Sequence, residues 1–229
     1  MPATGHRVYL IDASIYIFRA WFSVPGSMTN HDGEPINAVH GFAGFLAGFL
    51  TRVQPEYMAV VFDESLTTSF RNDIYPAYKA NREPAPPELK RQFGMCRRLV
   101  EALGLAAYSS DRYEADDLIG TLAGCLRPAG FSIEILSADK DLAQLVGDSD
   151  VLWDYARDRR HASDDIPQLL GVHPAQVADW LALTGDAVDN IPGVPGIGAK
   201  TAAALLGTFG SLDGLYADLD AVAGSGLRG

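Results

Sequence analysis

The sequence has few cysteines and no long hydrophobic run. Its 229 residues include two cysteines, Cys96 and Cys125, which do not form a CxxC pair. We expect both to be small buried side chains in a reducing compartment. No apolar run reaches the roughly 18 residues that a membrane-spanning helix needs, and the first residues lack the basic start and apolar stretch of a signal peptide. We therefore expect a cytoplasmic protein with no membrane partner. We also expect a monomer.

Zinc motifs and disordered tracts are missing as well. The five histidines show no zinc-ligand spacing, so a zinc site is not expected. There is no low-complexity segment, and hydrophobic residues make up 48% of the chain, as in globular proteins. The chain is therefore expected to fold around a substantial core.

Positive charge is scarce overall. The net charge of −11 disfavours nucleic-acid binding over a broad basic face. Nine carboxylates, described below, account for most of this excess. Residues 64–98 have the opposite balance, with seven Lys and Arg residues against four acids. The basic side of the protein is thus expected in this segment.

Short apolar runs that end in an acid recur along the chain. They are VYLID ending at Asp12, MAVVFD ending at Asp63, SIEILSAD ending at Asp139 and VLWD ending at Asp154. Such runs are typical of buried strands in a parallel sheet. Helix-length segments at 38–53 and 88–103 lie between them, so the pattern predicts an α/β fold with a central, mostly parallel sheet flanked by helices.

The pattern changes twice along the chain. REPAPPE at 82–88 contains three prolines, which exclude a regular helix and mark a bend. After residue 160 the segments are all helical, which predicts an α/β core over residues 1–160 and a helical subdomain over 161–229. Within the subdomain, IPGVPGIGAKTAAALL predicts a hairpin between two helices at about 183–207, whose backbone N–H groups can bind phosphate without reading sequence.

Acidic residues from five segments are predicted to meet at one edge of the sheet. Ligands of parallel α/β sheets gather beyond the carboxyl ends of the strands, where Asp12, Asp63 and Asp139 would converge. The segments YEADDLIGTLAGCL, SADKDLAQL and LTGDAVDNIPG add Glu114, Asp116, Asp117, Asp141, Asp186 and Asp189. The last two share a face if their segment is helical. For YEADD, capping of a helix start is an alternative that stays open.

Such a cluster indicates metal chemistry. Carboxylates brought together repel one another unless cations bind them. Oxygen ligands without His or Cys favour Mg²⁺ or Mn²⁺. Two such ions about 4 Å apart can activate water and stabilise the leaving oxygen of a phosphodiester. The pattern therefore predicts phosphodiester hydrolysis by two divalent cations.

Six motifs in order carry a resemblance to a known family. LIDAS, VVFD, FRNDIYPAYKANR, YEADDLIGTLA, SADKDLAQL and LTGDAVDNIPGVPGIGAKTAAALL span about residues 7–207. They resemble the 5′ nuclease family of bacterial type, which includes flap endonucleases, stand-alone 5′-3′ exonucleases and the 5′-nuclease domain of DNA polymerase I. The resemblance implies a PIN-like or resolvase-like core, a basic arch or clamp inserted at about 64–98, and a helix-hairpin-helix subdomain.

The resemblance also implies residue roles. The first metal would lie among Asp12, Asp63, Glu114 and Asp116, and the second among Asp139, Asp141, Asp186 and Asp189, with Asp117 as a direct or water-mediated ligand. Lys79 and Arg82 would face the scissile phosphate from a helix at the base of the arch. The aromatic face of Tyr78 suits stacking on a base near the cut, and packing in the core is the alternative that stays open for it. The further DNA contacts implied are Arg19, Arg71, Gly196, Gly198, Lys200 and Thr201. A K⁺ ion would be held by carbonyls of the hairpin loop.

The expected function is that of a structure-specific 5′ nuclease in DNA replication and repair, acting as a 5′-3′ exonuclease and flap endonuclease. Its expected partners are DNA with 5′ ends, flaps or single/double-strand junctions, and RNA–DNA primers are a further candidate. A PIN-type metal-dependent ribonuclease and a catalytically weak branched-DNA-binding protein are alternatives. A phosphatase with Asp12 as nucleophile is a weaker option, because LIDAS lacks a second acid two residues on.

Overall fold

A six-stranded sheet forms the centre of the computed structural model, which describes residues 6–64 and 69–226. The strand order is β3-β2-β1-β4-β5-β6. Strands β1 to β5 are parallel and β6 is antiparallel to β5. The bounds are β1 (Arg7–Asp12), β2 (Tyr57–Asp63), β3 (Ala106–Ser110), β4 (Ser132–Leu136), β5 (Val151–Asp154) and β6 (Arg159–Ala162). The predicted mostly parallel sheet is confirmed.

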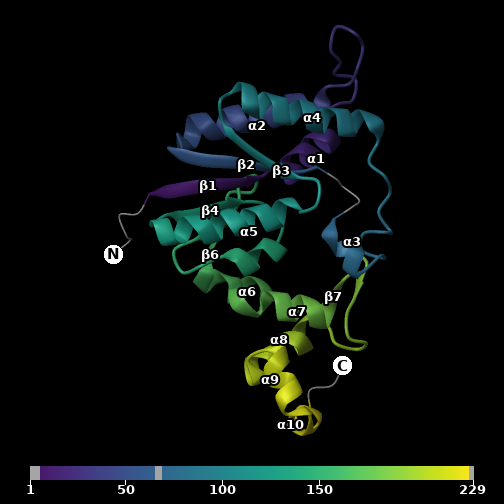
Figure 1. The fold of residues 1–229 in the computed structure, drawn as a ribbon, viewed down its shortest axis with the longest axis vertical. Coiled ribbons are helices and arrows are strands. Elements are labelled where there is room, and N and C mark those ends of the chain that lie inside the picture. Colours follow the sequence, from purple (N-terminus) through teal and green to yellow (C-terminus); the bar gives the residue numbers. More distant parts are fainter. Residues whose placement is uncertain (1–5, 65–68, 227–229) are drawn as a thin grey trace.

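Helices cover both faces of the sheet (Figure 1). One face packs against α1 (Ala13–Ser23), α2 (Asn37–Val53) and α4 (Pro87–Ala102), and the other against α5 (Ala115–Leu126). The alternation of side chains along a strand divides the core accordingly. Leu10 of β1 joins the cluster on the α5 face, and its neighbour Ile11 joins the cluster on the α2 face.

Two edge strands were not predicted from the sequence. β3 has the sequence AAYSS and β6 has RRHA, and neither contains the continuous apolar run that marks a buried strand. Edge strands bury less of their surface, so their pattern is weaker. A second difference is that β4 ends at Leu136 and not at Asp139, which lies three residues beyond the strand.

The chain after β6 is helical except for one short hairpin. It contains α6 (Ile166–Leu170), α7 (Val177–Thr184), α8 (Ala199–Phe209), α9 (Leu212–Ala217) and α10 (Leu219–Gly224), with the hairpin β7 (Gly185–Asp186) and β8 (Ile191–Pro192) between α7 and α8. A division of the chain near residue 160 remains our proposal. Residues 227–229 of the subdomain lie outside the described part of the chain.

The region predicted as a basic arch, residues 64–98, contains α3 (Phe70–Ile74), a series of turns and the first part of α4. Residues 65–68 of this region lie outside the described residues. Across residues 6–64 and 69–226, no helix combines the length and apolar character needed to cross a membrane.

One prediction about the cysteines was wrong. Cys96 is buried in the core, as expected, but Cys125 is exposed. Cys125 lies near the carboxyl end of α5, whose buried residues are Ala115, Ile119 and Ala123. That spacing places Cys125 off the buried stripe of the helix.

A candidate metal centre at the carboxyl ends of the strands

A cleft of about 660 Å³ opens at the carboxyl ends of β1, β2 and β4. Eight of the nine predicted carboxylates line it, and they come from five segments of the chain. They are Asp12, Asp63, Glu114, Asp116, Asp139, Asp141, Asp186 and Asp189. The sheet therefore brings together acids that are up to 177 positions apart in the sequence.

Asp12 is fixed at the end of β1 by two hydrogen bonds. Its Oδ1 accepts from the backbone N–H of Ser14 at 3.1 Å, which caps α1. Its Oδ2 accepts from the Ser137 hydroxyl at 2.9 Å, and the side chain is buried. The first turn of α1 and the segment after β4 together hold this carboxylate.

Asp63 is held in a similar way at the end of β2. The Ser14 hydroxyl donates to Asp63 Oδ2 at 2.7 Å, and the backbone N–H of Ala115 donates to Oδ1 at 2.8 Å. Sequence reasoning missed Ser14 and Ser137. Their signal was present, since each lies two residues from a predicted ligand, Asp12 or Asp139.

Asp139 and Asp141 occupy the loop that follows β4. The Asp139 N–H donates to the Ser137 hydroxyl at 3.1 Å, and Asp139 Oδ1 accepts from the Asp141 N–H at 2.9 Å. Lys140, between them, also lines the cleft, which the motifs do not predict. The loop thus contributes one cation as well as two acids.

Asp186 and Asp189 lie in the β7–β8 hairpin and not on a helix, so the condition for a common helical face is not met. Asp186 Oδ1 accepts from the backbone N–H groups of Val188 at 2.7 Å and Asp189 at 3.3 Å. This is a turn stabilised by an aspartate side chain. The turn, not helical periodicity, directs both carboxylates toward the cleft.

The neck of the hairpin requires glycine. A Cβ on Gly193 would lie 2.3 Å from the carbonyl carbon of Thr184 and 2.6 Å from the nitrogen of Gly185. We expect Gly193→Ala to displace Asp186 and Asp189 and to lower Mn²⁺ affinity about 10- to 100-fold. Titration calorimetry would measure this. Gly207→Ala is the control, because no atom lies within 4 Å of its Cβ position. Equal affinity in both variants would contradict the assignment.

The cationic residues Lys79 and Arg82 also line the cleft, but not from a helix. Helix α3 ends at Ile74, and residues 76–82 form successive turns. Lys79 has φ +56, a left-handed conformation that is uncommon for a side chain of this size. The predicted helix is therefore wrong. Both side chains line the cleft, and their role toward a phosphate stays a prediction.

The turn segment is attached to the β7–β8 hairpin. The Lys79 N–H donates to the Asp189 carbonyl at 2.9 Å, and the Asn190 amide donates to the Ala77 carbonyl at 2.7 Å. The Asn81 amide donates to the Ala187 carbonyl at 2.9 Å. These bonds place the cations beside the acids of the hairpin, and sequence reasoning did not identify the two asparagines.

Ion pairs link the two cations to the acids. Lys79 Nζ lies 2.7 Å from Glu114 Oε2 and 4.0 Å from Asp189 Oδ2. Arg82 pairs with the other oxygen of Asp189. These side chains are partly buried, so water screens the pairs less than it would at the surface. Each cation is held where a ligand in the cleft would meet it.

Tyr78, Arg71 and Asp117 are placed differently from the prediction. Tyr78 is buried and its hydroxyl donates to Glu114 at 3.0 Å, so its ring is not available to stack on a base. Arg71 is bound to Asp117 through two bonds of 2.7 and 2.9 Å, so its guanidinium is already engaged. Asp117 does not line the cleft, and it accepts from the Glu114 N–H at the start of α5. The capping alternative describes Asp117 correctly.

Burial and mutual repulsion make several acids hard to ionise. Burial, aided by Asp63 and Asp139, raises the pKa of Asp12 to about 7. Burial and four neighbouring carboxylates raise the pKa of Asp116 to about 8. Burial, with Asp139, Asp186 and Asp189, raises the pKa of Asp141 to about 6. The carboxylates that raise each pKa divide the acids into two groups, with Asp12 and Asp116 in one and Asp141 in the other. Asp139 raises the pKa of all three, so it lies between the two groups.

The donor set fits hard divalent cations. Among the described residues, no three His, Cys, Asp or Glu side chains are already arranged to hold a metal ion. Several of these carboxylates are engaged instead with protein donors, namely Ser14, Ser137, Lys79 and Arg82. Eight carboxylates in one cleft, several with a raised pKa, still form an all-oxygen site that cations would stabilise.

We predict that the metal-free protein loses thermal stability as the pH rises. Because folding raises the pKa of Asp12, Asp116 and Asp141, the folded state prefers their protonated forms. Their stabilising contribution is complete below about pH 4 and is lost as the pH rises through 6 to 8. Melting in EDTA from pH 5.5 to 8.5 should show a falling Tm, about 2–4 °C for each kcal/mol lost. Mg²⁺ should restore it, and a Tm independent of pH and Mg²⁺ would contradict the site.

The predicted DNA contacts of the subdomain lie on its surface. Gly198 precedes α8 as its N-cap, and Gly196 has φ +81 in the preceding turn. Lys200 is exposed and Thr201 partly exposed in the first turn of α8. Arg19 is exposed on α1 and lines a second, smaller hollow. Their roles, and the K⁺ ion expected at the hairpin loop, remain predictions.

The fold and the cleft define a doubly wound α/β protein with a carboxylate-lined edge and a helical C-terminal part. Residues 7–171 match the model of the 5′-3′ exonuclease N-terminal resolvase-like domain, and residues 172–228 match the 5′-3′ exonuclease C-terminal SAM fold. The chain belongs to the 5′-3′ exonuclease family. This confirms the resemblance noted in the motifs.

Curated relatives agree with this membership, and a solved structure shares the fold. The chain is 43% identical to DNA polymerase I of Rhizobium leguminosarum. The match covers 92% of this chain and 21% of the polymerase. It is 36% identical to a 5′-3′ exonuclease of Aquifex aeolicus, covering 91% of this chain and 71% of that one. A structure of the bacteriophage T5 flap endonuclease with DNA and metal ions matches with a TM-score of 0.73 at 21% identity, covering 92% and 78% of the two chains. The chain spans about a fifth to a quarter of the polymerases it matches.

Proposed function

We propose that this chain is a structure-specific 5′ nuclease that hydrolyses DNA phosphodiesters as a 5′-3′ exonuclease and flap endonuclease in replication and repair. One observation carries the proposal: eight carboxylates from five segments meet in one cleft beside Lys79 and Arg82. Membership of the 5′-3′ exonuclease family supports it. So does the fold shared with a flap endonuclease whose structure contains DNA and metal ions.

Two divalent cations, Mg²⁺ or Mn²⁺, are the proposed cofactors. Asp12, Asp63, Glu114 and Asp116 would hold one, and Asp139, Asp141, Asp186 and Asp189 the other. When bound, such ions activate water and stabilise the leaving oxygen of a phosphodiester. Asp117 is not included among the ligands, because it caps α5 and pairs with Arg71.

The protein's own cations would bind the phosphate to be cut. Lys79 pairs with Glu114 at 2.7 Å, and Arg82 pairs with Asp189. A phosphate in the cleft would compete with these carboxylates for the same donors and accept charge-assisted hydrogen bonds. The turn segment is attached to the β7–β8 hairpin, so it holds these side-chain donors in fixed positions. Fixed donors of this kind can stabilise the negative charge that develops in a transition state. We assign both residues a catalytic role on this basis.

The serines and asparagines would position these groups. Ser14 and Ser137 orient Asp12 and Asp63 through bonds of 2.7 to 2.9 Å. Asn81 and Asn190 join the turn segment to the hairpin. None needs to touch the substrate. Their substitution should therefore loosen the geometry of the site without removing a ligand.

The turn after the β7–β8 hairpin, together with the start of α8, is the proposed grip on duplex DNA. The backbone around Gly196 and Gly198, with Lys200 and Thr201, presents N–H, ammonium and hydroxyl donors to a phosphate. Contacts of this kind fix the backbone without reading bases, so we propose recognition of structure, not sequence. A K⁺ ion at the loop, action on RNA–DNA primers, a monomeric state and a cytoplasmic location belong to the same proposal.

A cleavage assay on matched substrates tests this function. The wild-type chain would be incubated with labelled 5′-flap, nicked, gapped and single-stranded DNA, in Mg²⁺, Mn²⁺ or EDTA. We expect cutting near the 5′ junction with either metal and none with EDTA. Flap binding without cutting would favour a binding module. Cutting of single-stranded RNA without any dependence on a junction would favour a PIN-type ribonuclease.

A further inference from the structure

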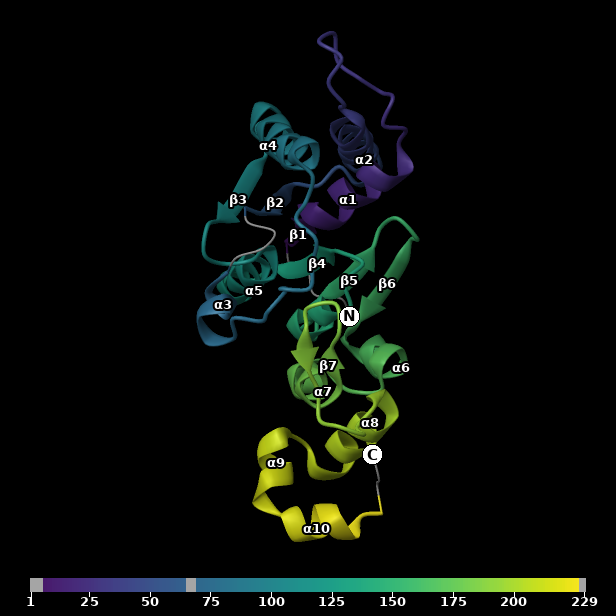
Figure 2. The ribbon, with the colours of Figure 1, turned by 90° about the vertical axis from the view of Figure 1, so that its right-hand side faces the viewer.

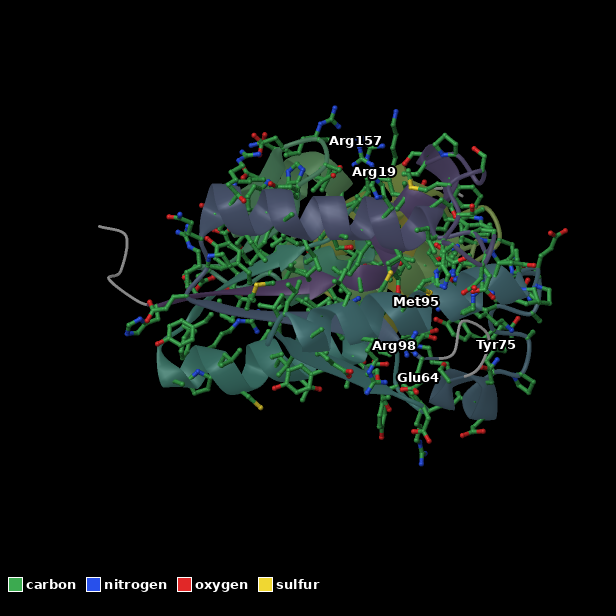
Figure 3. All side chains as sticks on the ribbon, turned by 90° about the horizontal axis from the view of Figure 1, so that it is seen from above. Arg19, Glu64, Tyr75, Met95, Arg98 and Arg157 are labelled. Carbon is green, nitrogen blue, oxygen red and sulfur yellow. The ribbon has the colours of Figure 1, made fainter. Side chains whose placement is uncertain are left out.

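A second hollow, of about 350 Å³, adjoins the carboxylate cleft on the side of the β5–β6 turn. Ile15 and Ala138 line both the cleft and this hollow, so the two are neighbours. Arg19 of α1 and Arg157 of the turn lie on its wall. Figure 3, which labels both arginines, shows them close together on the same side of the molecule.

Both guanidinium groups have donors to spare. Among residues 6–64 and 69–226, Arg19 forms no ion pair, and Arg157 pairs with a single acid, Asp154, at 3.0 Å. Arg157 is 65% exposed, so most of its guanidinium faces solvent. Other arginines form more hydrogen bonds to acids. Arg71, for example, donates two hydrogen bonds to Asp117.

Asp154 fixes the direction of Arg157. It is the last residue of β5, only 13% exposed, and its Oδ1 accepts from the Arg157 backbone N–H at 3.2 Å. Its Oδ2 accepts from the Arg157 guanidinium. One carboxylate thus holds both the turn and the side chain, which reduces the freedom that Arg157 would lose on binding an anion.

The hollow lies across the cleft from the cations already described. Lys79 and Arg82 belong to the turn segment after α3, and Arg157 belongs to the β5–β6 turn. Figure 2 shows α3 to the left of β4, and β5 and β6 to its right. A DNA strand that crosses the cleft between these two turns carries phosphates on both sides of the phosphate that is cut.

We propose that Arg157, held by Asp154, and Arg19 form a second phosphate-binding subsite for the DNA backbone, on the side of the cleft opposite Lys79 and Arg82. The inference rests on the proposed function and extends it to a substrate-positioning site. The subsite binds phosphate oxygens through charge and hydrogen bonds, so it does not depend on base sequence. Asp154 acts as a positioning residue that does not contact DNA.

The salt dependence of DNA binding tests the subsite. Binding of a 5′-flap DNA in EDTA would be followed by fluorescence anisotropy between 50 and 200 mM KCl, conditions in which cutting does not interfere. We expect Arg157→Ala and Arg19→Ala each to weaken binding roughly 3- to 10-fold and to reduce the slope of log K against log salt by about 1, the value for one lost phosphate contact. Arg157→Lys should keep the slope close to that of wild type.

Arg159→Ala is the matched control. Arg159 lies two residues further on, is exposed and lines neither hollow, so its removal changes the net charge equally. The slope of log K against log salt is then compared among the three proteins. The subsite would be overturned if Arg157→Ala keeps the circular dichroism spectrum of wild type and has the same slope as wild type or Arg159→Ala. Wild-type cutting in Mg²⁺ is a separate measurement. If it fails while the slope changes as expected, the nuclease proposal falls and the phosphate subsite stands.

Discussion

Replacing Asp139 with Ala is expected to abolish flap cleavage, with a loss of more than about 10³-fold in rate, while flap binding in EDTA is retained. Asp139 lies between the two groups of acids, because its charge raises the pKa of both Asp116 and Asp141. Its removal would therefore weaken both proposed cation positions. Single-turnover cleavage and anisotropy on the same substrate measure the two quantities.

Two variants keep this result interpretable. Asp139→Asn retains an oxygen that can accept from the Asp141 N–H, so the local loop should persist. Asp148→Ala removes the same charge from an exposed residue outside the cleft and should cut at the wild-type rate. Cleavage by Asp139→Asn within tenfold of wild type would show that this carboxylate is not a metal ligand.

Replacing Lys79 with Ala is expected to change two properties in opposite directions. The rate at saturating enzyme should fall about 10²- to 10³-fold, as when one fixed donor to transition-state charge is removed. Mn²⁺ affinity should increase, because the ammonium that occupies Glu114 at 2.7 Å no longer competes with the metal. A purely structural role for Lys79 would not produce tighter metal binding together with slower chemistry.

Lys79→Arg separates charge from shape. Both this variant and the alanine variant keep a Cβ, so the strain of the left-handed backbone at this position is unchanged. We expect the arginine variant to recover part of the rate and to bind Mn²⁺ as wild type does. Equal rates for wild type and Lys79→Ala would remove this residue from the proposed mechanism.

The position of the site was predictable because it depends on strand ends. Asp12 and Asp63 each follow an apolar run, and strands with such runs lie side by side in a parallel sheet. Their carboxylates must then lie at the same edge. The edge strands β3 and β6 were not predictable in the same way, because their short, partly polar sequences lack that signal.

The local conformation of the cationic segment was predicted wrongly, although a signal was available. Pro76 disfavours a helical conformation for the residue before it, and α3 ends at Ile74. The family resemblance favours a helix here, whereas this restriction argues against one. The left-handed Lys79 and the hydrogen bonds from Asn81 and Asn190 depend on contacts with the distant β7–β8 hairpin, which no local pattern contains.

Tyr78, Arg71 and Asp117 show why residue type alone does not assign a role. An aromatic ring, a guanidinium and a carboxylate near a nuclease site each suit DNA or metal binding. Here Tyr78 is buried beneath Glu114, and Arg71 and Asp117 neutralise each other. Partners and burial, which are set by the folded chain, decide between a role in binding and a role in support.

The number of Mn²⁺ ions bound tests the central claim most directly. Titration calorimetry of the wild-type chain, without DNA, should give two sites, and Asp186→Ala, checked by circular dichroism, should give one. These values follow if acids from the sheet edge and from the β7–β8 hairpin form separate cation positions in a common cleft. Absence of Mn²⁺ binding by the folded wild-type chain, or an unchanged stoichiometry in Asp186→Ala, would contradict a two-metal site.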